Sequence, residues 1–134
     1  MLTKDDIESF LVRLAATGAT YSEVEPGFWI VRPSQESDLS IAVNYSPPVL
    51  LLRIDVMTLP SDGARSATLT RRLLELNASD LLHGSYGIQD QHLVLTEALE
   101  LSALDYEEFL ASYESMTLAL ASHLRELGSF REAR

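Results

Sequence analysis

The sequence predicts an α+β domain, in which three helices pack on an antiparallel sheet of about five strands. Apolar residues follow helical spacing near both ends and in the middle of the chain, and they alternate with polar residues in the stretches between. The strand segments are joined mainly by short turns, which suit antiparallel neighbours. The expected order is α-β-β-β-α-β-β-α, with room for one more strand before the middle helix.

The first helix is predicted over residues 4–17. Thr3 and Asp6 have the spacing of a capping box at its start, and Gly18 is the expected stop. Apolar residues within the segment fall on one face, which predicts an amphipathic helix packed on the sheet. This stripe consists of Ile7, Phe10, Leu11 and Leu14.

The last helix, over residues 106–128, has the strongest signals. Asp105 and Glu108 form the expected capping box, and apolar residues keep helical spacing until Gly128. Leu104 and Phe109 have the spacing of a hydrophobic staple at the same end. We therefore expect this helix to be the longest.

A middle helix is predicted over residues 64–77. Three leucines at helical spacing indicate its buried face. Ser61 or Asp62 is the expected cap, and Asn77 the expected left-handed stop. The leucines are Leu69, Leu73 and Leu76.

The remaining segments alternate as strands do, or form short apolar runs between turn signals. Pro26-Gly27, Pro47-Pro48 and Asp90-Gln91 separate them in pairs, which predicts hairpins. The candidate strands cover residues 21–25, 28–32, 39–45, 49–57, 86–89 and 92–101.

Two strand segments carry large apolar side chains on both alternations. Successive side chains of a strand point to opposite faces, so each segment presents hydrophobic surface to both faces of the sheet. Either loops and helices cover the second face, or it packs on a copy of the protein or receives another molecule. The segments are Phe28-Trp29-Ile30-Val31 and Val49-Leu50-Leu51-Leu52.

Charge and length narrow the classes of partner. The 134 residues, expected to form one domain, include 20 acidic and 10 basic side chains, for a formal net charge of −10. This field repels phosphate backbones and anionic membranes, so we expect neither nucleic acid nor membrane as a partner. No apolar run approaches the roughly 20 residues of a membrane span, and the first residues do not form a signal sequence. These observations predict a cytoplasmic protein.

The composition also restricts the chemistry. The chain has no cysteine, which excludes disulfides, thiolate metal sites and cysteine nucleophiles. His83, His92 and His123 are too far apart for a metal-binding motif, so we expect no metal site. A cofactor-free enzyme is a third interpretation, which a meeting of one of these histidines with a carboxylate in a closed pocket would support.

Four stretches in the second half of the chain, followed by a long helix, form a recognisable series. They are Leu73-Leu-Glu-Leu-Asn77, Gly84-Ser-Tyr-Gly-Ile88, His92-Leu-Val-Leu-Thr-Glu-Ala-Leu-Glu-Leu101 and Leu104-Asp-Tyr-Glu-Glu-Phe109. This series resembles the type III secretion chaperone-like superfamily, which includes the Tir-chaperone (CesT-like) group and the YbjN-like proteins. The resemblance covers residues 65–127, and the order of elements agrees over the whole chain.

The resemblance implies a sheet flanked by helices, commonly in a homodimer, without cofactor or catalytic centre. Members of the secretion group hold an extended client segment against apolar patches on the first helix and early strands. Carried over by position, the client-binding candidates are Phe10, Leu14, Trp29, Val31, Leu50 and Leu52. The dimer-interface candidates are Leu69, Leu73, Leu76, Tyr86 and Ile88. Each has a competing interpretation as core.

We therefore expect a chaperone-like protein without enzymatic activity, which binds a client protein or peptide and shields its extended apolar segment, as a homodimer. The excess of acidic residues would keep the complex soluble. The alternative is a small regulatory or structural dimer of the YbjN-like kind, without a secreted client.

Overall fold

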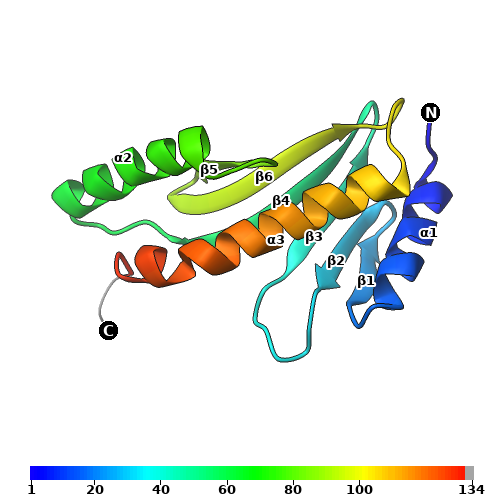
Figure 1. Ribbon diagram of the computed structural model, residues 1–134, viewed down its shortest axis with the longest axis horizontal. Helices are drawn as coiled ribbons and strands as arrows, with labels where there is room; N and C mark the ends of the chain where they lie inside the picture. The colour runs from blue at the N-terminus through cyan, green and yellow to red at the C-terminus, as the bar shows by residue number, and fades with distance from the viewer. Residues whose placement is uncertain (132–134) are drawn as a thin grey trace.

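Three helices and six strands make up residues 1–131, the part of the chain that the computed structural model describes (Figure 1). They occur in the expected order, which confirms the α+β class. The elements are α1 (Lys4–Ala15), β1 (Thr20–Glu25), β2 (Phe28–Arg32), β3 (Ile41–Ser46), β4 (Val49–Thr58), α2 (Gly63–Ser79), β5 (Ser85–Gln89), β6 (His92–Glu100) and α3 (Tyr106–Gly128).

The strands form one antiparallel sheet in the order β1-β2-β3-β4-β6-β5. It has six strands where about five were expected, because both segments around the Pro26-Gly27 turn pair with each other and β2 also pairs with β3. Gly27 has a φ of +77° in this turn, a conformation that glycine adopts without a steric cost. The edges of the sheet are β1 and β5.

The helices begin at the capping residues found in the sequence. Thr3 and Asp6 form a reciprocal capping box, with 3.3 Å from the Asp6 amide nitrogen to Thr3 Oγ1 and 2.8 Å from the Thr3 nitrogen to Asp6 Oδ2. Asp105 accepts the Glu108 N–H at 2.8 Å, and Asp62 caps α2. These bonds satisfy amide groups that have no partner inside a helix.

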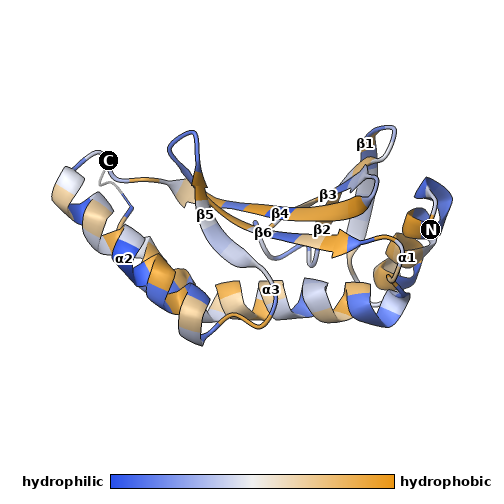
Figure 2. Cartoon of the chain, turned by 90° about the horizontal axis from the view of Figure 1, so that it is seen from above, coloured by the Kyte–Doolittle hydropathy of each residue, from blue (hydrophilic) through white to orange (hydrophobic). Residues whose placement is uncertain are grey.

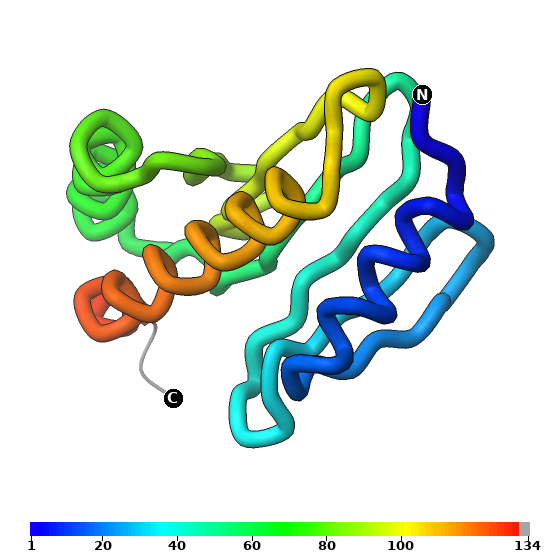
Figure 3. The backbone as a smooth tube through the Cα atoms, turned by 45° about the vertical axis from the view of Figure 1, so that its right-hand side comes forward, coloured from blue at the N-terminus to red at the C-terminus, as the bar shows by residue number. Residues whose placement is uncertain are grey.

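The helices form one layer on one side of the sheet (Figure 2). α1 runs alongside β1 and β2, α3 crosses the middle of the sheet, and α2 lies beside the edge strand β5 (Figures 1 and 3). Buried side chains from the strands and helices meet between these layers in one hydrophobic cluster. The largest fully buried members are Trp29, Phe109, Ile7, Leu11, Ile41, Leu50, Leu52, Ile54, Leu69, Leu76, Leu93 and Leu95.

The end of α2 differs from the expectation that Asn77 would stop the helix. The helix continues to Ser79, and Asp80 caps it in a right-handed conformation. The amide of Asn77 instead bonds to the backbone of Tyr86, donating to its carbonyl oxygen at 3.1 Å and accepting its N–H at 2.7 Å. Asn77 therefore satisfies two backbone groups of an edge strand.

Candidate functional site

The side of the sheet away from the helices, here termed the open face, has its own set of mostly apolar side chains. The strand register places them in two neighbouring rows across the sheet, which are Phe28, Asn44, Leu51 and Ala98, and Ile30, Ala42, Arg53 and Thr96. Leu51 is 38% exposed, whereas its neighbours Leu50 and Leu52 are buried in the core. This contrast follows from the alternation of side chains along a strand.

Polar bonds close one part of the open face. Asp55 Oδ1 accepts from Arg53 Nη2 at 3.0 Å and from Nε at 3.3 Å, while Arg53 Nη1 donates to Gln89 Oε1 at 2.6 Å. These bonds bridge from β4 to β5 across β6. Val94, which is opposite Asp55 on β6, is only 4% exposed although it faces away from the helices. Neighbouring side chains therefore cover this part of the face.

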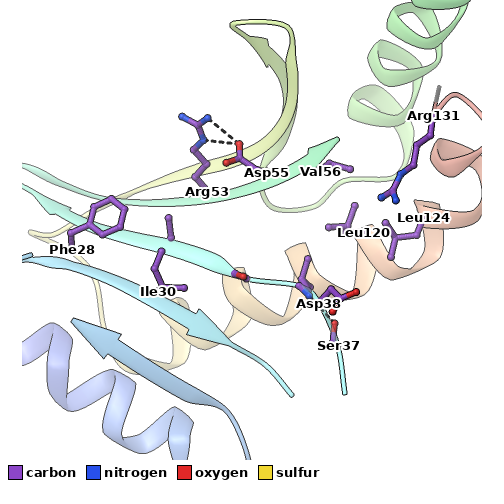
Figure 4. A pocket seen from close by; sticks show the side chains of 13 residues that line it. Phe28, Ile30, Ser37, Asp38, Arg53, Asp55, Val56, Leu120, Leu124 and Arg131 are labelled. Carbon is purple, nitrogen blue, oxygen red and sulfur yellow. Dashed lines mark hydrogen bonds and ion pairs between the residues drawn. The ribbon is translucent and has the colours of Figure 1, made fainter. Parts of the chain in front are cut away.

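The apolar part of the open face continues into a hollow of about 760 Å³ (Figure 4). β3 pairs with β4 only as far as Arg53, so the later part of β4 has no strand on that side. Val56, Leu120 and Leu124 border the hollow at this point, and residues from the β2–β3 connection form another wall. The hollow therefore joins the open face to the carboxyl-terminal half of α3.

Five of the six client-binding candidates lie in the core between sheet and helices. Each is at most 3% exposed; they are Leu14, Trp29, Val31, Leu50 and Leu52. Half-buried Phe10 packs edge-on against Tyr106, with ring centroids 5.7 Å apart. The indole Nε1 of Trp29 donates to Glu8 Oε1 of α1 at 3.4 Å. These side chains hold the helix layer on the sheet in this structure, and their role in client binding stays a prediction.

Among the dimer-interface candidates, Ile88 is 48% exposed on the edge strand β5. The other four are at most 6% exposed and pack within the core; they are Leu69, Leu73, Leu76 and Tyr86. A further apolar side chain, Leu74 of α2, is 64% exposed. The assignment of the candidates to a dimer interface stays a prediction.

His123 meets a carboxylate, but both of its ring nitrogens have partners. Its Nε2 lies 3.2 Å from Asp80 Oδ2, and its Nδ1 lies 2.8 Å from the hydroxyl of Tyr86. A ring with its proton on Nε2 donates to Asp80 and accepts from the Tyr86 hydroxyl. Burial raises the pKa of the Tyr86 phenol, which keeps it a donor. With His123 only 6% exposed, the cluster joins α2, β5 and α3.

His83 meets both a hydroxyl and a carboxylate, with a geometry unlike a catalytic triad. Its Nδ1 lies 3.2 Å from Ser112 Oγ and 3.8 Å from Glu97 Oε2. A triad needs these two partners on opposite ring nitrogens. Glu97 also accepts the N–H of Gly84 at 2.6 Å. These contacts fasten the α2–β5 connection to β6 and α3.

The described part of the chain, residues 1–131, has neither a metal-binding cluster nor a membrane-spanning helix. No group of three or more His, Asp or Glu residues in this range is arranged to hold a metal ion. None of its helices combines the length and apolar character needed to cross a membrane. The remaining histidine, His92, is exposed at the start of β6.

The residues of the open face were absent from the predicted site, although the sequence carried a signal for them. The prediction selected Trp29 and Leu50, whereas the side chains that lie on the open face are their neighbours Phe28, Ile30 and Leu51. Apolar residues occupy both alternations of β2 and of the start of β4. The pattern alone does not tell which alternation faces the helices.

The fold resembles solved structures at low sequence identity. A chain of the heterodimeric complex ExoU–SpcU from the type III secretion system of Pseudomonas aeruginosa is 13% identical with a TM-score of 0.69, over 89% of this chain and 95% of that one. YbjN from E. coli is 15% identical with a TM-score of 0.63, over 95% and 97%. A chain of the ExsC–ExsE complex is 14% identical with a TM-score of 0.57, over 93% and 96%. No curated protein matches in sequence.

A match to a family model covers nearly the whole chain. The CesT_Tir_1 model matches residues 2–133. Together with the shared fold, this match confirms the resemblance that the second half of the sequence indicated. The chain therefore belongs to the CesT_Tir_1 family of type III secretion chaperone-like proteins.

Proposed function

We propose that the protein is a chaperone-like binding protein, without enzymatic activity, that shields an extended apolar segment of a client protein. The open face is the observation that carries this proposal. It is an apolar sheet surface that no helix in residues 1–131 covers, and it continues into a hollow of about 760 Å³. Contiguous apolar surface of this kind commonly marks an interaction site.

Family membership supports a protein partner. The chain belongs to the CesT_Tir_1 family, and two of the similar structures come from protein complexes, ExoU–SpcU and ExsC–ExsE. The proposed setting is the cytoplasm, where a chaperone would meet a client before export. The net charge of −10 would keep the complex soluble while the apolar surfaces are joined.

An extended segment suits the dimensions and chemistry of the open face. Alternate side chains of the segment would lie on Phe28 and Leu51, and a larger one would enter the hollow beside Leu124. The gain comes from removing apolar surface from water, about 25 cal/mol for each Å². The polar bonds of Arg53 would remain in place at the border of the site.

The proposed assembly is a homodimer that pairs through α2 and β5. Ile88 and Leu74 are exposed apolar side chains on these two elements. β5 is also an edge strand, so the backbone of Ile88 faces no strand of its own sheet on the outer side. These features supply both apolar area and strand-edge hydrogen bonds to a second copy.

The second candidate function is a regulatory or structural dimer that binds no client. It is favoured by the fold shared with YbjN, at a TM-score of 0.63. The two candidates differ in what the open face does. A client-binding protein binds a peptide on the open face, whereas a protein of the second kind binds no peptide there.

A peptide titration separates the candidates. We would measure fluorescence anisotropy of a labelled synthetic peptide that alternates leucine and threonine, with the wild type, with F28S/L51S, and with the matched variant V12S/L118S on exposed helix positions. Loss of at least about tenfold in affinity for F28S/L51S alone supports the proposal. Absence of binding by the folded wild type, or equal losses in both variants, would overturn it. Far-UV circular dichroism verifies that each variant is folded.

A further inference from the structure

The carboxylates of the sheet differ in their bonding. Glu23 of β1 pairs with Lys4 at 3.1 Å on the helix side, and Asp55 of β4 pairs with Arg53 at 3.0 Å on the open face. On the open face, the carboxylates of Glu25 and Glu100 have no ion pair or hydrogen bond with any residue in the range 1–131. Their negative charges are therefore not offset by a bonded group there.

One of the two free carboxylates, Glu25, lies at one end of an apolar row, and the other, Glu100, lies in the adjoining row beside the opposite end. Glu25 of β1 is opposite Phe28, which begins the row that continues through Leu51 to Ala98. Glu100 follows Ala98 by two residues on β6, so it lies on the same face as Ala98. Four strand spacings separate β1 from β6, which is roughly 20 Å at about 4.8 Å each.

The arginines of the open face lie outside this row, including Arg32, which is two residues beyond Ile30 on β2. Arg53 belongs to the neighbouring row, and its guanidinium is held by Asp55 and Gln89. Arg131 lines the hollow beside Leu124, on the side of α3 (Figure 4). The apolar row is thus bordered by negative charge at both ends.

From this charge pattern we infer that the client segment carries basic side chains at both ends of its apolar stretch, which pair with Glu25 and Glu100. This inference rests on the proposed function and specifies the occupant of the same face. An extended segment rises about 3.3 Å for each residue, so roughly six residues would separate the two basic positions. The net charge of −10 would speed the approach of such a segment.

The test compares three peptides that share one leucine-threonine stretch. Their ends carry arginine, glutamine or glutamate, and fluorescence anisotropy gives each affinity at low and high salt. We expect the arginine peptide to bind about three- to tenfold more tightly than the glutamine peptide at low salt, as two exposed ion pairs allow. We expect the difference to shrink at high salt, because salt screens exposed charges.

Two double variants of equal net charge test whether the preference for the arginine peptide depends on Glu25 and Glu100. E25Q/E100Q should abolish the preference for the arginine peptide. E107Q/E114Q removes the same charge from exposed positions on α3, so it should retain most of the preference. Equal losses in both pairs would show a general charge effect and overturn the inference.

The same titrations distinguish failure of the inference from failure of the proposed function. If all three peptides bind equally and L51S weakens all of them, the open face binds peptides but its carboxylates do not favour basic ends. This outcome overturns the inference and leaves the proposed function standing. If the folded protein binds none of the peptides, both statements are overturned.

Discussion

The side-chain amide of Asn77 bonds to both backbone groups of Tyr86, with 3.1 Å from Nδ2 to the carbonyl oxygen and 2.7 Å from the Tyr86 nitrogen to Oδ1. A neighbouring strand would supply the same two bonds. The amide thus joins α2 to the edge strand β5 and occupies part of that edge. Two residues later, Ile88 is left exposed.

Replacing Asn77 with alanine should destabilise the protein. N77A leaves the N–H and carbonyl of Tyr86 without this partner, so we expect the free energy of unfolding to fall by about 1–3 kcal/mol. Urea denaturation followed by circular dichroism measures the change. N44A, on the open face, is the matched control and should change it by less than about 0.5 kcal/mol. Equal effects of the two variants would contradict this account of Asn77.

A charge at Ile88 should separate the proposed dimer. I88D places a carboxylate on the outer part of β5, where a second copy would bury it, so we expect a monomer. Sedimentation velocity gives the mass directly. L118D places the same charge on the exposed face of α3 and should leave the wild-type mass unchanged. A wild type that sediments as a monomer would rule out the dimer.

Trp29 and Leu51 should respond differently to truncation. Trp29 is 0% exposed, so W29A should reduce the free energy of unfolding by about 3–5 kcal/mol. L51A removes a 38% exposed side chain and should cost about 1 kcal/mol or less while weakening peptide binding. Urea unfolding by circular dichroism and the anisotropy titration measure both quantities. A stable W29A protein with weakened peptide binding would instead support the client-binding assignment of Trp29.

Acid should weaken the bonds that Glu23 makes within the β1–β2 turn and to α1. The pKa of Glu23 is lowered, first because its carboxylate accepts the N–H of Gly27 and then because it pairs with Lys4. The pKa of Glu23 is thus lower in the folded state than in the unfolded state, where it is about 4.3. The stabilisation is fully present above the pKa of the unfolded state and is lost as the pH falls through the pKa of the folded state.

Urea denaturation between about pH 6 and pH 3 tests this assignment. E23Q should show a smaller loss of stability on acidification than the wild type. K4M retains the bond from Gly27, which is the larger cause, and should keep most of the wild-type pH dependence. If K4M removed as much of the pH dependence as E23Q, the ion pair would be the main cause.

Two glycines should give opposite results with alanine. Gly84 has a φ of +83°, and an added Cβ would lie 3.2 Å from the Thr96 carbonyl oxygen and from Met116 Cγ. G84A should therefore lose about 1–2 kcal/mol or more. Gly63 is in the first turn of α2 with open space around it, so G63A should gain up to about 1 kcal/mol. Differential scanning calorimetry shows the sign of each change.

The sequence predicted the parts of the fold that depend on local interactions. Thr3, Asp62 and Asp105 cap their helices because a short oxygen-bearing side chain and the nearby amide groups lie within a few residues of each other. The strand segments were found through alternation and turn residues, which are also local. These signals were sufficient for the order of the elements and the α+β class.

The parts that were missed depend on contacts between distant segments. The local sequence predicts that the helix ends at Asn77, whereas the side chain of Asn77 bonds to Tyr86, which belongs to another element. Phe28 and Trp29 are both large and apolar, so the choice of core side requires the position of α1, which places Glu8 next to the Trp29 indole. The hollow at Leu124 exists because β3 ends before β4 does, a property of register that the sequence pattern does not contain.

Alternate side chains of β2 lie on opposite sides of the sheet. Trp29 and Val31 belong to the core, whereas Phe28 and Ile30 lie on the open face. Under the proposed function, substitutions at the second pair would change what the surface binds with little cost to folding. New binding preferences would then arise by small steps during evolution, because binding and stability depend on alternate residues of the same strand.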